Sequence, residues 1–191
     1  MKVICISAKA QHGKDTVANF MKECLEAKGK RVLVTHYADL VKYVCKTFFD
    51  WDGQKDEKGR TLLQYVGTDI VREKESDYWV GFIADMLYFF EDQWDYVLIP
   101  DTRFPNEINY LKDAGFDVLY IRVIRENFES PLTEEQQKHP SETALDDYEA
   151  EVLLYNDSTL ENLKFSVERL TDVIVQLPLQ IGEEKKESCQ D

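Results

Sequence analysis

A loop with a glycine and a lysine lies between a short run rich in β-branched residues and a segment with the apolar spacing of a helix. The apolar run covers residues 2–7, and the loop and the first helical residues are Ala10, Gln11, His12, Gly13, Lys14, Asp15 and Thr16. Backbone N–H groups in such a loop and at the start of the helix can surround an anion, and the lysine reaches its outer phosphates. The pattern predicts a P-loop that binds a nucleoside triphosphate.

Two positions differ from the usual P-loop pattern. Ala8 stands where the first glycine is expected, and Asp15 takes the place of the hydroxyl residue that binds magnesium, with Thr16 one step later. Alanine in a turn that needs a positive φ costs about 1 kcal/mol. A carboxylate beside a triphosphate is repelled unless magnesium or another cation lies between them. An ordinary strand–turn–helix unit with a solvated lysine is the alternative interpretation.

Composition limits the class of protein. The 191 residues suffice for one compact domain, and no apolar run approaches the length of about 20 residues that a membrane span needs. With 23 Lys and Arg against 37 Asp and Glu, the net charge is −14, which disfavours binding to nucleic-acid polymers and to anionic membranes. A small phosphorylated substrate stays compatible with this charge if basic residues converge on one cleft. Both a monomer and a homodimer remain open.

The expected compartment follows from the N-terminus and the cysteines. No charged-then-apolar signal segment begins the chain. The cysteines have no CxxC pair and no metal-ligand spacing, and they are Cys5, Cys24, Cys45 and Cys189. We therefore expect reduced thiols, most of them packed, in a cytoplasmic protein. If a phage encodes the protein, this compartment is the cytoplasm of the host.

Strand-like and helix-like segments alternate along the chain, which is typical of an α/β protein with a parallel sheet. The predicted strands are residues 2–7, 31–36, 96–100, 117–124 and 151–155. One predicted helix follows the P-loop, and four more cover residues 38–49, 61–74, 78–94 and 106–114. The last predicted helix begins after Ser158 as its N-cap, and its core face carries Leu160, Leu163, Val167, Leu170 and Ile174. We expect a single domain over residues 1–178 and a flexible acidic tail over 179–191.

Two polar, weakly periodic stretches interrupt this alternation. They are the loop at residues 50–60, which opens an insertion of about residues 50–76, and the segment 125–149. Such segments often carry ligand-binding residues or close over a site. We expect the 50–76 insertion to bind the substrate and the 125–149 segment to act as a lid.

Asp101 and Arg103 follow the third predicted strand. Ligands of open α/β sheets bind outside the carboxyl ends of the strands. Asp101 could hold magnesium there, directly or through water, or take a proton from a nucleophile, and Arg103 could bind a phosphate with two hydrogen bonds. The alternative is that Asp101 caps the next helix and that Arg103 pairs with Glu107.

Further candidates lie in the 50–76 insertion and at the end of the second strand. Arg60 and Arg72 flank an apolar segment and could hold the phosphate of an acceptor, or they are solvated surface residues. Gln64 between them could read the edge of a base. Asp39 and Lys42 place an acid and a base at a strand-to-helix turn, where Asp39 could equally be an N-cap.

The last candidates are in and beyond the 125–149 segment. Arg125 begins this segment and could stabilise the charge on a transferred phosphoryl group, whereas Arg122 could pair with an acidic neighbour. His139 has no second ligand at metal-binding spacing, so we expect it to form hydrogen bonds. Asn156, before Asp157 at the end of the fifth strand, could present backbone groups to an adenine, or this pair forms a left-handed turn and an N-cap.

Five segments, in order, resemble the deoxynucleoside monophosphate kinase family of bacteriophages and some bacteria. They are residues 13–16 (Gly-Lys-Asp-Thr), 37–42 (Tyr-Ala-Asp-Leu-Val-Lys), 63–72 (Leu-Gln-Tyr-Val-Gly-Thr-Asp-Ile-Val-Arg), 101–107 (Asp-Thr-Arg-Phe-Pro-Asn-Glu) and 139–142 (His-Pro-Ser-Glu). The resemblance extends to about residue 176, and the combination of 13–16 with 101–107 is its most specific part. The family commonly carries Asp after the P-loop lysine, so Asp15 conforms to it.

This resemblance implies a P-loop NTPase fold of three layers, similar to adenylate kinase, with a five-stranded parallel sheet, an acceptor-binding insertion and a lid. It implies transfer of the ATP γ-phosphate to a deoxynucleoside 5′-monophosphate, with Mg²⁺. Lys14 and the loop amides would hold the β- and γ-phosphates, while Asp15 and Thr16 would organise the metal and the phosphates. Arg60, Arg72 and Arg103 would contact the acceptor phosphate, and Arg125 would come from the lid.

Two other kinds of function remain open. A P-loop phosphomevalonate kinase shares the Asp-Thr-Arg element, and dephospho-coenzyme A kinase is a more distant relative; the acceptor pocket decides between such substrates. A regulator that binds ATP without transferring a phosphoryl group is the alternative from another class. The number of arginines argues against it, because a binding protein needs no second phosphate site.

Overall fold

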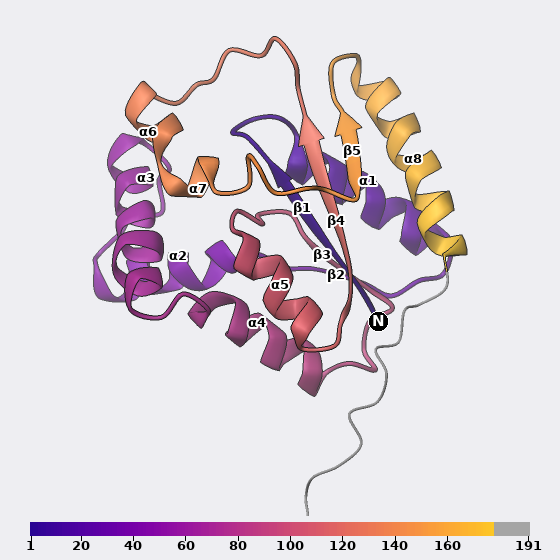
Figure 1. Ribbon diagram of the computed structural model, residues 1–191, viewed down its shortest axis with the longest axis horizontal. Coiled ribbons are helices and arrows are strands. Elements are labelled where there is room, and N and C mark those ends of the chain that lie inside the picture. The colour runs from indigo at the N-terminus through magenta and orange to yellow at the C-terminus, as the bar shows by residue number, and fades with distance from the viewer. Residues whose placement is uncertain (178–191) are drawn as a thin grey trace, which may run out of the picture.

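The computed structural model describes residues 1–177 and contains a parallel sheet of five strands, as the sequence predicts (Figure 1). The strands are β1 (Lys2–Ala8), β2 (Val32–Val34), β3 (Tyr96–Ile99), β4 (Asp117–Ile124) and β5 (Val152–Tyr155). Their order in the sheet is β2-β3-β1-β4-β5, and every neighbouring pair is parallel. The carboxyl ends of all five strands therefore meet at one edge, and β1, which leads into the P-loop, lies at the centre.

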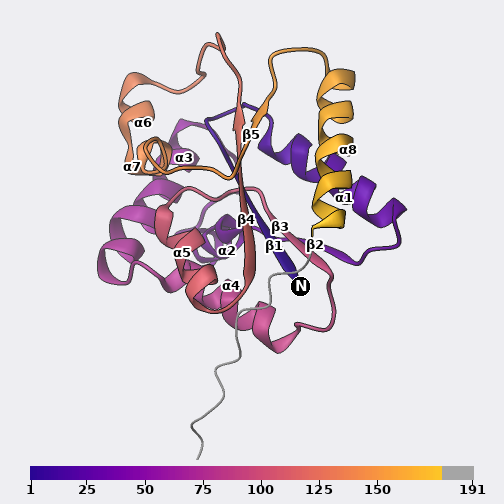
Figure 2. The same ribbon diagram turned by 45° about the vertical axis from the view of Figure 1, so that its right-hand side comes forward.

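Helices cover both faces of the sheet and complete three layers. Helices α1 (Lys14–Ala27) and α8 (Leu160–Gln176) lie side by side on one face, and α4 (Tyr78–Phe89) and α5 (Pro105–Asp113) lie on the other with α2 (Tyr37–Phe48) (Figures 1 and 2). The alternation along β1 explains this arrangement. Val3 and Cys5 belong to the core cluster beneath α2, α4 and α5, whereas Ile4 and Ile6 belong to the cluster beneath α1 and α8.

Within the 50–76 insertion, residues 57–72 form two consecutive helices rather than the single α-helix expected over 61–74. Helix α3 (Glu57–Gln64) runs directly into the π-helix η1 (Tyr65–Arg72). α3 begins four residues earlier than expected, because the Asp56 side chain caps it by accepting a hydrogen bond from the Gly59 N–H at 2.8 Å. Periodicity does not distinguish an α-helix from a π-helix over so few turns, so the sequence did not indicate η1.

The 125–149 segment contains two short helices that the sequence did not predict, α6 (Glu134–Lys138) and α7 (Pro140–Thr143). Each is too short to show a helical period, but Thr133 caps α6 with a capping box and Pro140 starts α7. The segment leaves β4 and reaches the side of α3 in both views (Figures 1 and 2). His139 anchors it there, with Nε2 3.4 Å from Asp69 Oδ1 of η1.

Several expected boundaries differ in the structure. β2 is shorter than the predicted 31–36 run, and α4 ends at Phe89 rather than at Trp94. Thr159, not Ser158, caps α8 by accepting a hydrogen bond from the Asn162 N–H at 3.2 Å. Leu160 is consequently at the first helical position and exposed instead of facing the core.

The remaining expectations concern the cysteines, the membrane and the tail. Cys5 and Cys45 are buried and Cys24 is partly buried, and all three are free thiols. Over residues 1–177, none of the helices combines the length and the apolar character needed to cross a membrane. Cys189 and the predicted tail at 179–191 lie outside the described residues.

Candidate active site

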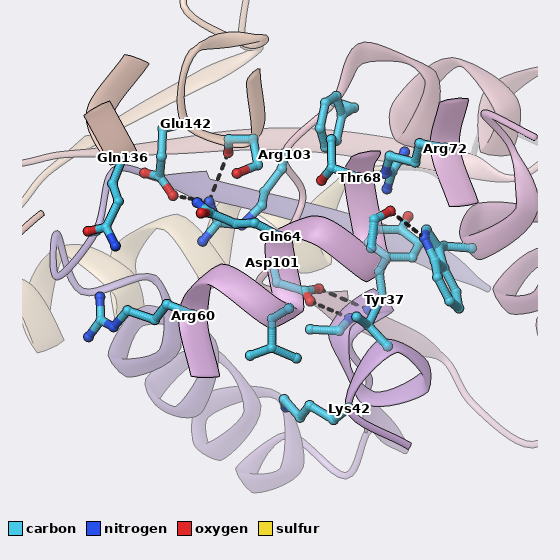
Figure 3. Close-up of a pocket in the computed structure, with 18 of the residues that line it drawn as sticks. Tyr37, Lys42, Arg60, Gln64, Thr68, Arg72, Asp101, Arg103, Gln136 and Glu142 are labelled. Carbon is cyan, nitrogen blue, oxygen red and sulfur yellow. Dashed lines mark hydrogen bonds and ion pairs between the residues drawn. The ribbon is translucent and has the colours of Figure 1, made fainter. Parts of the chain in front are cut away.

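A cleft of about 330 Å³ lies at the carboxyl ends of the strands, between the P-loop, the 50–76 insertion and the 125–149 segment (Figure 3). Three acidic residues line it, and they are Asp101, Glu107 and Glu142. Six cationic residues line it as well, and they are Lys14, Lys42, Lys55, Arg60, Arg72 and Arg103. The cleft is thus positive on a chain whose net charge is −14. Such a local reversal of charge favours an anionic ligand.

The P-loop gets its shape from Gln11 and Gly13, not from its first position. Gln11 has φ 60° and Gly13 has φ 100°, whereas Ala8 still belongs to β1 and has no positive φ, so the cost expected for alanine does not arise. A Cβ on Gly13 would lie 2.6 Å from Asn156 Nδ2. Asn156 Nδ2 donates to the His12 carbonyl at 2.9 Å. Glycine is therefore needed at position 13 both for its φ and for the close approach of Asn156.

Asn156, directly after β5, holds the P-loop through this hydrogen bond, and the contact was not expected. Its φ is not positive, so the left-handed turn considered for the Asn156–Asp157 pair is wrong. The N-cap considered for Asp157 is wrong as well, because Thr159 caps α8. Asp157 instead accepts a hydrogen bond from the Glu126 N–H at the start of the 125–149 segment.

Lys14 and Asp15 begin α1 and form an ion pair with each other. Lys14 Nζ lies 2.9 Å from both carboxylate oxygens of Asp15. His36 Nε2 lies 3.8 Å from Asp15 Oδ1. The pKa of the Asp15 carboxyl is lowered by His36 and then by Lys14, against burial, which raises it. Thr16 occupies the first turn of α1, one residue further on.

His36 links the P-loop to α2, and its role was not expected from the sequence. Its Nδ1 lies 3.5 Å from Asp39 Oδ2, and its pKa is raised, chiefly by Asp15. Asp39 is not an N-cap, because His36 occupies that position of α2; Asp39 forms an ion pair with Lys42 at 2.6 Å. Lys42 lines the cleft, and Asp39 does not. The one feature of the sequence that could have indicated this role is the position of His36, directly after the second strand, where ligand-binding residues of a parallel sheet lie.

Asp101 is held at the N-terminus of α2 rather than of the next helix. Its two carboxylate oxygens accept hydrogen bonds from the N–H groups of Tyr37 at 3.1 Å and of Ala38 at 2.8 Å (Figure 3). The residue is only 8% exposed and lines the cleft. The alternative that Asp101 caps α5 is therefore wrong, since Phe104 is the N-cap of α5.

Arg72 is paired with Glu107 and lies over an aromatic ring. Arg72 Nη2 contacts Glu107 Oε1, and the guanidinium carbon lies 4.2 Å from the centre of the Phe104 ring. Glu107 Oε2 also accepts hydrogen bonds from the N–H groups of Arg103 at 2.6 Å and of Phe104 at 3.1 Å. Burial raises the pKa of the Glu107 carboxyl to about 7. Glu107 was expected, in one alternative, to pair with the Arg103 side chain, and this is wrong.

The Arg103 side chain instead contacts the 125–149 segment. Its Nη1 donates to the Ser141 carbonyl at 2.8 Å and contacts the Glu142 carboxylate (Figure 3). Its Nε and Nη2 have no protein partner within residues 1–177. One edge of the guanidinium is thus held by the protein, and the other edge is available to a ligand. Glu142 was not expected to contribute to the site.

Arg60 and Gln64 of α3 line the same cleft (Figure 3). Arg60 Nε donates to the Lys55 carbonyl at 3.0 Å. Gln64 makes no side-chain hydrogen bond to the part of the chain that the structure describes, so its amide can serve a ligand. The structure therefore brings Arg60, Gln64, Arg72 and Arg103 together with Lys14 and Asp101.

Arg125 lies beside the P-loop and not in this cleft. Its guanidinium carbon is 4.5 Å from the centre of the Phe128 ring, and its backbone N–H donates to His12 Nδ1 at 3.1 Å. The pKa of His12 is lowered by burial and then by Arg125. Arg122 binds the carbonyls of Leu145, Asp146 and Tyr148 rather than an acidic neighbour. His139 forms hydrogen bonds with Ser141, as expected.

The sequence pattern of the family described as deoxynucleotide monophosphate kinase matches residues 51–167, which is more than half of the chain. The chain belongs to the deoxynucleotide monophosphate kinase family. The matched range includes the 50–76 insertion almost completely, Asp101, Arg103 and the 125–149 segment. A deoxynucleotide monophosphate kinase of Enterobacteria phage T4 is 31% identical over 117 residues, which cover 60% of this chain and 46% of the phage protein. The chain thus spans less than half of the length of that relative.

Solved structures of small-molecule kinases share the fold of this family member. The APS kinase CysC of Mycobacterium tuberculosis, in complex with AMPPNP and APS, has a TM-score of 0.52 and 14% identity over 92% of this chain and 98% of that chain. A dephospho-CoA kinase from Campylobacter jejuni has a TM-score of 0.52 and 12% identity over 91% of this chain and 98% of its own. At this identity the likeness shows the fold alone, which is that of a P-loop kinase.

Proposed function

We propose that this protein transfers the γ-phosphoryl group of ATP to a deoxynucleoside 5′-monophosphate and releases ADP and a deoxynucleoside diphosphate. One observation carries the proposal. Lys14 of the P-loop lines the same cleft of about 330 Å³ as Arg60, Arg72 and Arg103. A protein that only binds ATP needs Lys14 but not the three arginines. A kinase with a phosphorylated acceptor needs positively charged side chains for both the ATP and the acceptor phosphate in one cleft.

The P-loop would bind the donor. Its amides and Lys14 would hold the β- and γ-phosphates, with Lys14 exchanging its contact with Asp15 for the phosphates. His12 and Asn156 keep the loop in shape. The contact between Arg125 and His12 supports a role for Arg125 on the donor side of the site. Asn156 would then support ATP binding by holding the P-loop and not by contacting the adenine.

The acceptor would lie between α2, the 50–76 insertion and the loop after β3. Arg103 would bind its phosphate with the guanidinium edge that Ser141 and Glu142 leave available. Arg72, whose Nη1 and Nη2 contact the Ser76 carbonyl and Glu107, would add its positive charge beside this phosphate. Arg60 and Lys42 add positive charge to this part of the cleft, and Asp39 orients Lys42. Gln64, with no protein partner for its side chain within residues 1–177, would contact the base.

Magnesium fits the oxygen-donor residues beside the P-loop. The carboxylates of Asp15 and Asp101 and the Thr16 hydroxyl are the ligand type that Mg²⁺ takes, and it binds with few protein ligands when substrate phosphates supply the rest. The amides of Tyr37 and Ala38 keep the Asp101 carboxylate in one orientation. When bound, the ion would neutralise charge on the phosphates.

The chemistry then rests on position and charge. An oxygen of the acceptor phosphate forms a bond to the γ-phosphorus, the bond from the γ-phosphorus to the bridging oxygen breaks, and ADP leaves with the electron pair. The acceptor oxygen is already anionic, so no protein base is required. Lys14, Arg72 and Arg103 would stabilise the charge on the oxygens around the phosphorus. We place this reaction in the cytoplasm, with no nucleic-acid polymer or membrane as partner, in a monomer or a homodimer.

A coupled ADP-release assay tests the proposal. ATP and Mg²⁺ are supplied with each common deoxynucleoside monophosphate, each ribonucleoside monophosphate, phosphomevalonate and dephospho-coenzyme A. Turnover with one or more deoxynucleoside monophosphates is the expected result. Turnover with phosphomevalonate or dephospho-coenzyme A alone would replace the substrate and keep the mechanism. Bound ATP with no turnover across the panel would favour a nucleotide-binding regulator.

A further inference from the structure

Five of the six cations that line the cleft have a partner in the protein. Lys14 pairs with Asp15, Lys42 with Asp39, Arg72 with Glu107 and Arg103 with Glu142, and Arg60 donates to a carbonyl. The side-chain ammonium of Lys55 is the exception. Within residues 1–177 it makes neither a hydrogen bond nor an ion pair.

Lys55 also shares the cleft with other positively charged side chains. Burial lowers its pKa first, and the charges of Lys42 and Lys14 lower it further, while Asp15 opposes them. Lys55 is an exposed residue, as Lys58 is, but its side chain lines the cleft together with Lys14 and Lys42. Three ammonium groups that line one cleft, one of them without a counter-charge among the described residues, indicate that an anion belongs among them.

The backbone that carries Lys55 is fixed in place. Trp51 Nε1 donates to the Gln54 carbonyl at 3.0 Å, and Arg60 Nε donates to the Lys55 carbonyl at 3.0 Å. Gly59 packs so closely on this turn that a Cβ there would overlap the Gln54 carbonyl oxygen. The turn at residues 51–59 is thus held on both sides of Lys55, and its side chain starts from a defined point at the cleft wall.

We propose that Lys55 is a further catalytic residue, which contacts the phosphoryl group while this group passes from donor to acceptor. The inference rests on the proposed function and names a residue of the same site. Lys14 would approach the phosphoryl group from the P-loop and Lys42 lies on the acceptor side, so Lys55 completes a set of three ammonium groups. No proton moves to or from Lys55 during the step. Its charge offsets the negative charge that spreads over the phosphoryl oxygens as the bond to the bridging oxygen breaks.

Lys58 provides a matched control, because it is an exposed lysine of α3 that does not line the cleft. We expect Lys55→Ala to lower kcat/KM by roughly 100-fold, mostly through kcat, as for the loss of one preorganised charge contact. Lys55→Arg should recover part of the activity, and Lys58→Ala should match the wild type. Equal behaviour of Lys55→Ala and Lys58→Ala would overturn the proposal. A rise in the acceptor KM with unchanged kcat would overturn it too, because Lys55 would then only bind the acceptor.

Binding of inorganic tripolyphosphate, measured by calorimetry, separates this inference from the proposed function. It needs no acceptor and no turnover. Loss of roughly fivefold in affinity in Lys55→Ala, but not in Lys58→Ala, would support a phosphate contact at Lys55 even if no acceptor in the panel reacts. Turnover of a deoxynucleoside monophosphate by a Lys55→Ala protein as active as the wild type would instead reject Lys55 and keep the function.

Discussion

Arg72 and Glu107 form an ion pair that is almost completely removed from water, with side-chain exposures of 11% and 1%. Arg72 comes from η1 in the 50–76 insertion, and Glu107 comes from α5, which follows the loop of Asp101 and Arg103. The pair therefore joins the insertion to the edge of the sheet. Because Glu107 also binds the N–H groups of Arg103 and Phe104, one carboxylate holds two parts of the site together.

Removal of the Glu107 carboxylate should destabilise the protein. Glu107→Ala removes the counter-charge of the largely buried Arg72 side chain and the acceptor of two partly buried N–H groups, so we expect a loss of about 3 kcal/mol in the free energy of unfolding. Urea unfolding measures it. Glu23→Ala on the exposed side of α1 is the control and should cost much less. Equal losses in the two variants would show that the Arg72–Glu107 pair does not hold the insertion.

Glu107 should also make stability depend on pH. Burial raises its pKa to about 7 from the ordinary 4.5, so the folded protein binds a proton more readily than the unfolded chain between these values. The contribution of this group is therefore largest at low pH, and stability falls as pH rises from about 4.5 to 7. Glu107→Gln resembles the protonated form and should remove this part of the slope in unfolding measured at several pH values. An unchanged slope would contradict the raised pKa.

Arg103→Ala should impair transfer and leave the donor bound. The Arg103 side chain contacts Glu142 and Ser141 and leaves one edge for the acceptor phosphate, so its loss should lower kcat/KM for the acceptor by roughly 100-fold. The ATP dissociation constant, measured by calorimetry, should change by less than about threefold. Arg103→Lys keeps the positive charge but cannot form two parallel hydrogen bonds to a phosphate, so transfer by this variant should remain impaired. A parallel loss of ATP affinity in Arg103→Ala would place this residue on the donor side.

Gly13→Ala should weaken nucleotide binding for two separable reasons, the positive φ and the contact with Asn156. Gly29 offers the control, because it also has a positive φ, of 73°, but a Cβ at this position would meet nothing within 4 Å beyond its chain neighbours. Gly29→Ala should therefore lower stability by about 1 kcal/mol without affecting ATP binding. Gly13→Ala should lose ATP affinity by roughly tenfold or more, and combination with Asn156→Ala should restore part of it. No restoration in the double variant would reject the steric role of Asn156.

The sequence predicted the sheet, its parallel direction and the residues at the carboxyl ends of strands. These depend on local patterns: apolar runs define β1 and β3, and Lys14 and Asp101 follow such runs closely. The carboxyl ends of parallel strands share one edge of the sheet, so residues that are far apart in the sequence, such as Lys14 and Arg103, could be expected in one cleft.

The partners of these residues could not be predicted, because they depend on packing between distant segments. Arg103 binds Glu142 rather than Glu107 only because the 125–149 segment lies against the loop after β3. His36 and Lys55 enter the site through the approach of α2 and of the 50–76 insertion to the P-loop. Nothing in the local sequence of Lys55 distinguishes it from Lys58; the two differ in which of them faces the cleft.

The proposed function requires that the γ-phosphoryl group goes to a nucleotide acceptor, and labelled ATP tests this without a coupling enzyme. Wild-type protein is incubated with Mg²⁺, a deoxynucleoside monophosphate and ATP whose γ-phosphoryl group carries ¹⁸O, and the products are identified by mass spectrometry, with Lys14→Ala as the control. We predict that the deoxynucleoside diphosphate carries the label with the wild type and that Lys14→Ala forms less than about a tenth as much. Label found in inorganic phosphate alone, with every acceptor tested, would overturn the assignment of this cleft to a nucleotide kinase.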